Sequence, residues 1–109
     1  MTAEKKNDKP REVTARNSYK GFEVVFNTLT QRHIEKWIEG IAVNEGEKSA
    51  PKRNGNYVRA AFRAGWFELP VMSITSEADP ILDWTPDRVN WLANLIGDKY
   101  AEVMYFDPS

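Results

Sequence analysis

The spacing of hydrophobic and polar residues changes along this chain, and each spacing predicts a different element. In residues 21–27, GFEVVFN, apolar and polar positions largely alternate, which predicts a half-buried β-strand. A single strand leaves its backbone hydrogen-bonding groups unpaired, so this strand needs a partner. The partner comes either from residues 69–75, LPVMSIT, or from another copy of the chain.

The next segment has the periodicity of an amphipathic helix over about residues 29–42. Two interpretations of its start remain open. In one, Thr28 forms a capping box with Gln31. In the other, Thr30 is the N-cap and Leu29 packs on the apolar stripe. The stripe itself follows the i, i+3, i+4, i+7 spacing and consists of Ile34, Trp37, Ile38 and Ile41.

Residues 44–55, NEGEKSAPKRNG, have the composition of a loop. They lead into a short, alanine-rich helix over about residues 56–64, which Asn54 or Asn56 can cap. Gly65 then stands where helices often end with a positive φ. Three small residues of this helix allow a neighbouring backbone to approach closely, namely Ala60, Ala61 and Ala64.

The third helix, predicted over about residues 86–104, has the clearest start signal in the chain. Thr85 is the expected N-cap, Pro86 fits the first helical position, and Asp87 places negative charge at the positive end of the helix dipole. Its apolar stripe is wide, which predicts that it is covered on more than one side. Gly97 lowers helix propensity and indicates a close helix crossing.

These elements predict a small α+β fold that is mostly helical, with three helices and one or two short strands. Residues 17–109 form a single domain. Residues 1–16 are charged and lack apolar periodicity, so they are predicted to form a disordered tail. The predicted core consists of Phe22, Val24, Phe26, Ile34, Trp37, Ile38, Ile41, Val58, Phe62, Leu92, Ile96, Tyr100 and Val103.

Composition narrows the classes of function. The chain has no cysteine, which excludes disulfides and thiolate chemistry. Its longest apolar runs are only a few residues, and its charged first residues lack the apolar segment of a secretory signal. We therefore expect a cytoplasmic protein with no membrane partner.

Catalytic chemistry finds no support in the residue pattern. His33 is the only histidine and lies near a helix start, which favours a surface or capping role. Acidic residues four apart, Asp83 with Asp87 and Asp98 with Glu102, are typical of solvated helix faces and lack further ligands. We expect no enzyme activity, no cofactor and no metal.

The net charge of −1 conceals a marked segregation along the chain. Residues 51–66 carry four basic side chains and no acid, whereas residues 67–109 carry two basic and eight acidic side chains. We call the four basic residues, Lys52, Arg53, Arg59 and Arg63, the basic stripe. In one interpretation it is a solvated face on which Arg59 or Arg63 pairs with Asp98 or Glu102.

A functional interpretation of the same segment is a protein-binding surface. Interfaces favour arginine and tryptophan at their centres, and the acidic segment offers a complementary surface for self-association or for another protein. The predicted binding residues are Arg59, Arg63, Trp66 and Phe67. In the alternative for Gly65-Trp66-Phe67, the two aromatic side chains fold back onto the core.

Several segments, taken in order, resemble small proteins encoded among the structural genes of tailed phages and prophages, next to the major tail gene. These segments are TLTQRHIEKW, NYVRAAFRAGWFELP and a Trp-Thr-Pro helix start followed by VNWLANLIGDKY. The similarity covers residues 21–109 and points to tail-assembly chaperones. It implies a non-enzymatic protein of the host-cell cytoplasm, or one associated with the virion, that holds tail components during assembly.

The acidic excess after residue 67 departs from this resemblance, and a frameshift-extended form would not be visible in a protein sequence. Two rival functions belong to other classes. The first is a small nucleic-acid-binding regulator that uses the basic stripe, with Tyr57 and Trp66 as stacking surfaces. The overall acidic balance disfavours it. The second is a phage-encoded inhibitor of a host enzyme, in which the acidic segment mimics nucleic-acid charge.

Overall fold

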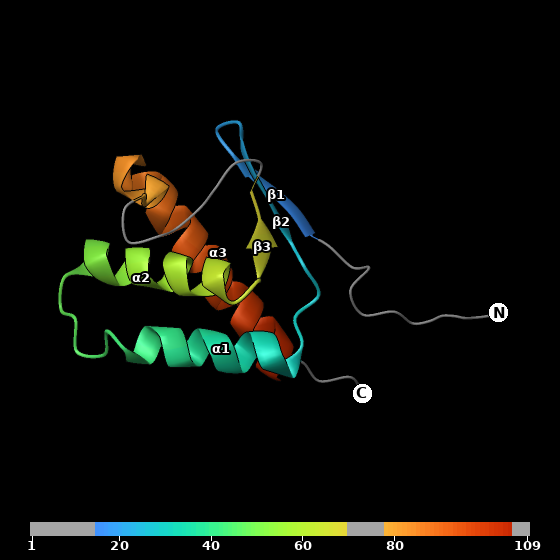
Figure 1. Cartoon of the computed structure of the whole chain (residues 1–109). Helices are drawn as coiled ribbons and strands as arrows, with labels where there is room; N and C mark the ends of the chain where they lie inside the picture. The colour runs from blue at the N-terminus through green and yellow to red at the C-terminus, as the bar shows by residue number, and fades with distance from the viewer. Residues whose placement is uncertain (1–14, 70–77, 106–109) are drawn as a thin grey trace.

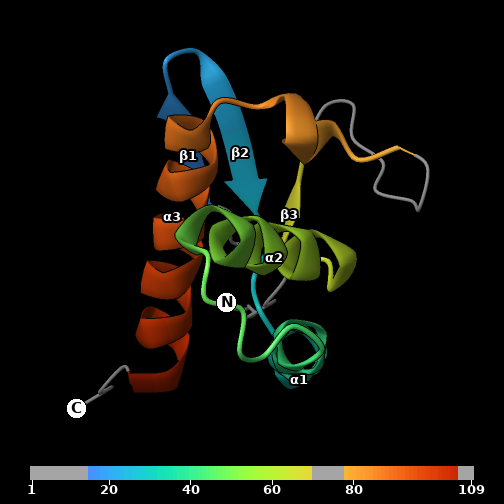
Figure 2. The same cartoon turned by 90° about the vertical axis from the view of Figure 1, so that its left-hand side faces the viewer.

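The structure is a computed structural model that describes residues 15–69 and 78–105. It confirms an α+β, mostly helical fold, with three helices and a three-stranded antiparallel sheet in the order β1-β2-β3. Helices α1 and α2 run side by side, and α3 crosses them steeply (Figures 1 and 2). The turn of the β1–β2 hairpin lies beside the start of α3, whereas α1 lies near its end (Figure 2).

The sheet answers the question of how the predicted strand is paired. β2 (Phe22–Phe26) lies between β1 (Ala15–Tyr19) and the short β3 (Phe67–Glu68), so both partners come from the same chain. The partner on the β3 side precedes the segment 69–75, of which residues 70–75 lie outside the described residues. Lys20 and Gly21 have φ values of 50° and 84°, as a two-residue hairpin turn requires.

β1 changes one predicted boundary. Its first two residues, 15 and 16, had been assigned to the disordered tail, but they pair with Phe26 and Val25 of β2. The error arose because β1, ARNSY, contains only one large apolar residue and is recognisable mainly through its partner. Residues 1–14 lie outside the described residues.

The first helix, α1 (Gln31–Ala42), begins after Thr30, which decides between the two predicted starts. The backbone N–H of Thr30 donates to Nδ1 of His33 at 2.9 Å. His33 thereby takes the place that glutamate or glutamine holds in a capping box. The prediction of a capping histidine is confirmed, and Leu29 packs against the core.

The second helix, α2 (Ala50–Arg63), begins six residues earlier than predicted. Pro51 lies in its first turn, where the missing N–H costs no hydrogen bond. Asn54 and Asn56 are inside the helix, so the prediction that one of them caps it was wrong. Gly65 follows the helix with a φ of 82°, as predicted.

The third helix, α3 (Pro86–Tyr105), starts at the predicted proline. The backbone N–H groups of Arg88 and Val89 both donate to the carbonyl oxygen of Thr85. A short 3₁₀ helix, Pro80–Asp83, precedes it. Gly97 makes no close helix crossing within residues 15–69 and 78–105, because a Cβ atom built there would meet none of their atoms within 4 Å.

The core lies where α2 packs between α1 and α3 and where the sheet covers α3. Most of the predicted core residues are buried or packed against the buried cluster. Two were wrong: Ile38 is 42% exposed and Val103 is 40% exposed. The fully buried side chains of greatest volume are Trp66, Phe26, Leu92, Ile96, Val24 and Val58.

Candidate protein-binding surfaces

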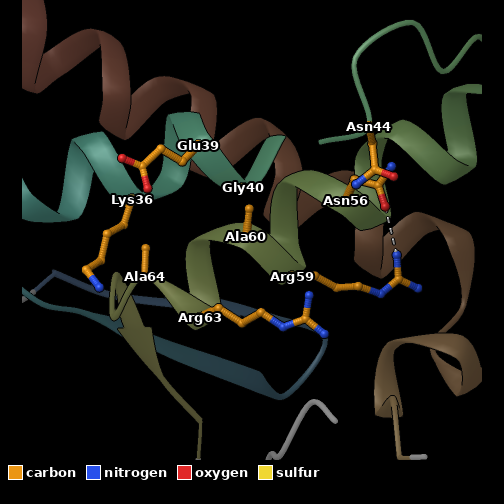
Figure 3. A pocket seen from close by; sticks show the side chains of 9 residues that line it. All are labelled: Lys36, Glu39, Gly40, Asn44, Asn56, Arg59, Ala60, Arg63 and Ala64. Carbon is orange, nitrogen blue, oxygen red and sulfur yellow. Dashed lines mark hydrogen bonds between the residues drawn. The ribbon is translucent and has the colours of Figure 1, made fainter. Parts of the chain in front are cut away.

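A groove runs between α1 and α2, and it contains both arginines that sequence reasoning had singled out (Figure 3). Its volume is about 340 Å³. Small residues in its middle and long charged residues along its sides produce the hollow. We call it the basic groove, and its lining consists of Lys36, Glu39, Gly40, Asn44, Asn56, Arg59, Ala60, Arg63 and Ala64.

The floor of the basic groove depends on a close helix crossing. A Cβ atom built on Gly40 would lie 2.9 Å from Cβ of Ala60, so the helices approach closely only because residue 40 has no side chain. Ala60 and Ala64 are both buried beside this crossing. The prediction that alanines of α2 allow a close approach is confirmed for Ala60, whose crossing partner is Gly40.

Arg59 is held in place by its own chain. Its Nε donates to Oδ2 of Asp79 at 2.5 Å, and its Nη1 donates to Oδ1 of Asn56 at 3.3 Å. The predicted pairing with Asp98 or Glu102 was therefore wrong for Arg59, and Glu102 pairs with Lys99 at 3.1 Å instead. Arg59 ties α2 to the residues that start the 3₁₀ helix.

The other two cations of the basic groove are not held by a partner in this way. Among residues 15–69 and 78–105, neither Lys36 nor Arg63 has an ion pair or a side-chain hydrogen bond, and both side chains are exposed. Lys36 extends from α1 toward Ala64, whereas Arg63 extends along α2 in the direction of Arg59 (Figure 3). The carboxylate of Glu39 points away from both arginines (Figure 3).

Trp66 and Phe67 do not take part in this surface. Trp66 is 0% exposed and Phe67 is 2% exposed, so the prediction that they contact a partner was wrong. The indole N–H of Trp66 donates to the backbone oxygen of His33 at 2.9 Å, and its ring packs 4.9 Å from that of Trp37. The alternative in which both aromatic residues fold back onto the core is the one observed.

His33 joins these core contacts to the start of α1. Burial is the main cause that lowers the pKa of His33, and the nearby charge of Arg32 lowers it further. Its Cδ2 would lie 3.6 Å from a Cβ atom on Gly65. The only histidine of the chain is thus engaged in capping and packing.

A second candidate surface is apolar and lies at the end of α3. Val103, Met104 and Tyr105 are 40%, 46% and 75% exposed, and we call these three residues the open end. The open end adjoins the core through aromatic contacts. The ring of Tyr105 lies 6.4 Å from that of Tyr100, which in turn lies 5.2 Å from the ring of Trp37.

Two further recesses are less polar than the basic groove. One of about 380 Å³ lies beside Ile38, Ile41 and Tyr57. The other, of about 290 Å³, is bounded by Leu82, which is 74% exposed, and by Trp84.

Asp87 has a structural role at the start of α3. It accepts hydrogen bonds from Oη of Tyr19 at 2.6 Å and from Nζ of Lys20 at 3.2 Å. A hydrogen bond with the side chain of Thr85, followed by those from Tyr19 and Lys20, holds the pKa of Asp87 well below its usual range. Sequence reasoning found the helix-dipole role of Asp87 but missed its bond to the hairpin turn, which lies 67 residues away in the chain.

The acidic pairs considered as metal ligands do not form a cluster. Across the described part of the chain, no three histidine, aspartate or glutamate side chains lie together in a way that could hold a metal ion. None of the described helices has the length and apolar character needed to cross a membrane.

Comparisons with known proteins identify no relative of this chain. No protein-family model, curated protein or solved structure matches it. The resemblance to tail-assembly chaperones therefore stays a prediction.

Proposed function

We propose that this protein is a non-catalytic binding factor whose open end is covered by another protein. The observation that carries the proposal is the exposure of Val103, Met104 and Tyr105 at the end of a helix whose earlier turns bury Leu92 and Ile96 in the core. Large apolar side chains grouped at one end of a helix indicate an interaction site. Tyrosine and methionine are also among the residues that interfaces favour.

Aromatic contacts within the chain hold part of the open end in place before a partner binds. Tyr105 stacks edge-on against Tyr100, whose ring is fixed against Trp37, so this part of the surface is already ordered. A preordered aromatic surface loses little conformational entropy when a partner covers it. The proposal needs no cofactor or metal.

In its narrower form, the proposal assigns the protein to the assembly of phage tails in the host-cell cytoplasm. Its support is the sequence resemblance over residues 21–109. The genes beside the coding sequence test this form directly. Neighbouring genes for a major tail protein and a tape-measure protein are expected, and a neighbourhood without phage structural genes would contradict it.

The rival nucleic-acid function loses one of its expected stacking surfaces. Trp66 is buried, Tyr57 is half-buried, and Arg59 is engaged by Asp79. Exposed aromatic rings are what single-stranded nucleic acid stacks on. Binding that falls steeply with salt would nevertheless favour this rival, since counterion release gives such a dependence.

The rival inhibitor function is weakened by contacts within the chain. Three acids of the segment 67–109 are engaged by the chain's own side chains: Asp79 by Arg59, Asp87 by Tyr19 and Lys20, and Glu102 by Lys99. Acids bound in this way present less free charge for imitating nucleic acid.

The test compares affinity captures of tagged protein from cells in which the phage genes are expressed. The parent chain is compared with a variant carrying Val103→Asp and Met104→Asp. We expect the parent to retain one or a few defined proteins and the variant to lose them, because charge cannot be buried against an apolar partner without a large free-energy cost.

Asn94→Asp is the matched control, since Asn94 is exposed on α3 but lies outside the open end. It should retain every partner. Circular dichroism establishes that all variants are folded. Partners kept by the double variant, or lost equally with the control, would contradict the assignment of the open end.

A further inference from the structure

We infer that the basic groove binds carboxylate side chains of an acidic segment in a partner protein. The inference rests on the proposed function only in taking the partner to be a protein, because the basic groove and the open end are formed by different residues. Its starting point is the difference between the cations of the groove. Arg59 is neutralised by Asp79, whereas Lys36 and Arg63 lack a charged partner among the residues that the structure describes.

The shape of the basic groove suits a side chain rather than a flat surface. Gly40, Ala60 and Ala64 leave a hollow between the two helices, and Lys36 and Arg63 extend from opposite helices beside it (Figure 3). The charged ends of Lys36 and Arg63 lie in different parts of the basic groove (Figure 3). One carboxylate of an acidic segment can therefore accept from the ammonium group of Lys36, and a second from the planar guanidinium of Arg63. Arginine is well suited to such a contact, since its guanidinium can donate two parallel hydrogen bonds to one carboxylate.

Arg59 prepares the groove for this contact. Its guanidinium is fixed by Asp79 and by Asn56, and it lies 3.0 Å from the position of a Cβ atom on Gly55. Because Arg59 is already ordered, it forms one wall at no further cost in side-chain entropy. Residue 55 must be small for the arginine to lie there.

The charge of the lining favours carboxylates over a phosphate backbone. Three cations, Lys36, Arg59 and Arg63, stand against one acid, Glu39, and the bond to Asp79 reduces the excess further. Proteins that hold nucleic acid gather many uncompensated cations, usually with exposed aromatic rings for single strands. A small excess with a nearby acid suits a protein segment of mixed polarity, in which acidic residues dominate.

The experiment uses the full chain and a defined probe, a fluorescein-labelled peptide of alternating glutamate and alanine. Its binding is measured at low ionic strength by fluorescence anisotropy, and a glutamine–alanine peptide of equal length is the uncharged reference. The test variant is Lys36→Glu with Arg63→Glu. Lys52→Glu is the matched control, because Lys52 is an exposed cation of α2 that does not line the basic groove.

We expect the double variant to weaken binding of the glutamate peptide about tenfold or more, since it removes two charge-assisted contacts. The control should weaken it by less than about threefold, as rim charges do. In nuclear magnetic resonance spectra, amide shifts caused by the peptide should centre on Gly40, Ala60 and Ala64. Equal losses of affinity in the double variant and the control would show unspecific attraction and overturn the inference. Amide shifts centred elsewhere on the protein would do the same.

Two competing probes test the choice of ligand. Oligothymidylate or inorganic phosphate that displaces the peptide at a lower concentration would make the groove a phosphate site, and the inference would be wrong. The open-end variant, Val103→Asp with Met104→Asp, should bind the glutamate peptide like the parent chain. Failure of the basic groove is thus separable from failure of the proposed function.

Discussion

The first and last turns of α3 continue one apolar stripe in very different surroundings. Near the start, Leu92 is 0% exposed, and Trp91 stacks 5.4 Å from the ring of Tyr19. At the end, Val103 and Met104 lie on the same stripe and are 40% and 46% exposed. An amphipathic pattern therefore shows which face of a helix can be covered, and only the fold shows how much of it the chain itself covers.

The difference has a cause in the topology. The β1–β2 hairpin reaches the start of α3, where Phe22 packs 4.8 Å from the ring of Trp84 and Arg88 lies 4.4 Å above Phe22. The end of α3 meets α1 mainly through Trp37 and Tyr100. Most of α3 accordingly stabilises the fold, and only its last turn is left for a partner in the proposed function.

The largest expected change in stability comes from comparing a buried and an exposed residue of α3. Leu92→Ala should lower the free energy of unfolding by about 2–5 kcal/mol, because it opens a cavity in a packed core. Met104→Ala, on the same stripe, should change it by no more than about 0.5 kcal/mol. Urea denaturation followed by circular dichroism measures both. Similar losses for the two variants would show that the open end is structurally covered.

A smaller loss of stability is expected from a substitution where α1 crosses α2. Gly40→Ala places a Cβ atom 2.9 Å from that of Ala60, so the helices must move apart. We expect a net loss of about 1–2 kcal/mol in thermal or urea unfolding, after the gain in helix propensity. A more stable variant would mean that the crossing can relax without strain, and would also question the floor of the basic groove.

For Gly97 of α3 we expect a substitution by alanine to increase stability, in contrast to Gly40. In Gly97→Ala the added Cβ atom meets nothing within 4 Å in the described part of the chain, and a poor helix former is replaced by the best one. It should stabilise the protein by about 1 kcal/mol in the same assay. Destabilisation would indicate that the surface beside Gly97 is covered, for example by self-association, which analytical ultracentrifugation would detect.

The smallest change in stability is expected for the solvent-exposed hydrogen bonds that Asp87 accepts from the hairpin residues Tyr19 and Lys20. The pKa of Asp87 is lowered in the folded chain below its ordinary value of 3.8. The stability that Asp87 contributes is therefore present above that value and is lost as the pH falls through the lower folded pKa. Asp87→Asn should lower the melting temperature at pH 7 but have less effect near pH 2. Asp83→Asn is the control, since Asp83 is an exposed acid of the 3₁₀ helix just before α3. A difference between parent and Asp87→Asn that is constant over this range would contradict the role assigned to Asp87.

The sequence predicted those elements whose signals are local. Thr85 and Pro86 mark the start of α3 by chemistry that acts within one turn, and the fold agrees. The start of α2 was missed because Pro51, Asn54 and Gly55 have the composition of a loop. In the fold, Pro51 fits the first helical turn and Gly55 lies under the guanidinium of Arg59.

The candidate site was less predictable, because it depends on which elements meet. Arg63 was identified within a run of basic residues, but Lys36 lies on another helix and carried no signal of its own. Trp66 follows a glycine that ends a helix, and sequence alone leaves both an inward and an outward direction open. The hydrogen bond to the carbonyl oxygen of His33 fixes the inward one.

The bond between the hairpin turn and Asp87 has a consequence for synthesis on the ribosome. Tyr19 leaves the ribosome 68 residues before the aspartate that accepts its hydrogen bond. At elongation rates of about 5–20 residues per second, the hairpin waits roughly 3–14 seconds for this contact. During that interval the turn is without Asp87, Trp84 and Trp91, whereas α1 and α2 are already adjacent along the nascent chain. The hairpin turn is therefore made early and is secured only when α3 emerges, although β2 can pair with β3 before then.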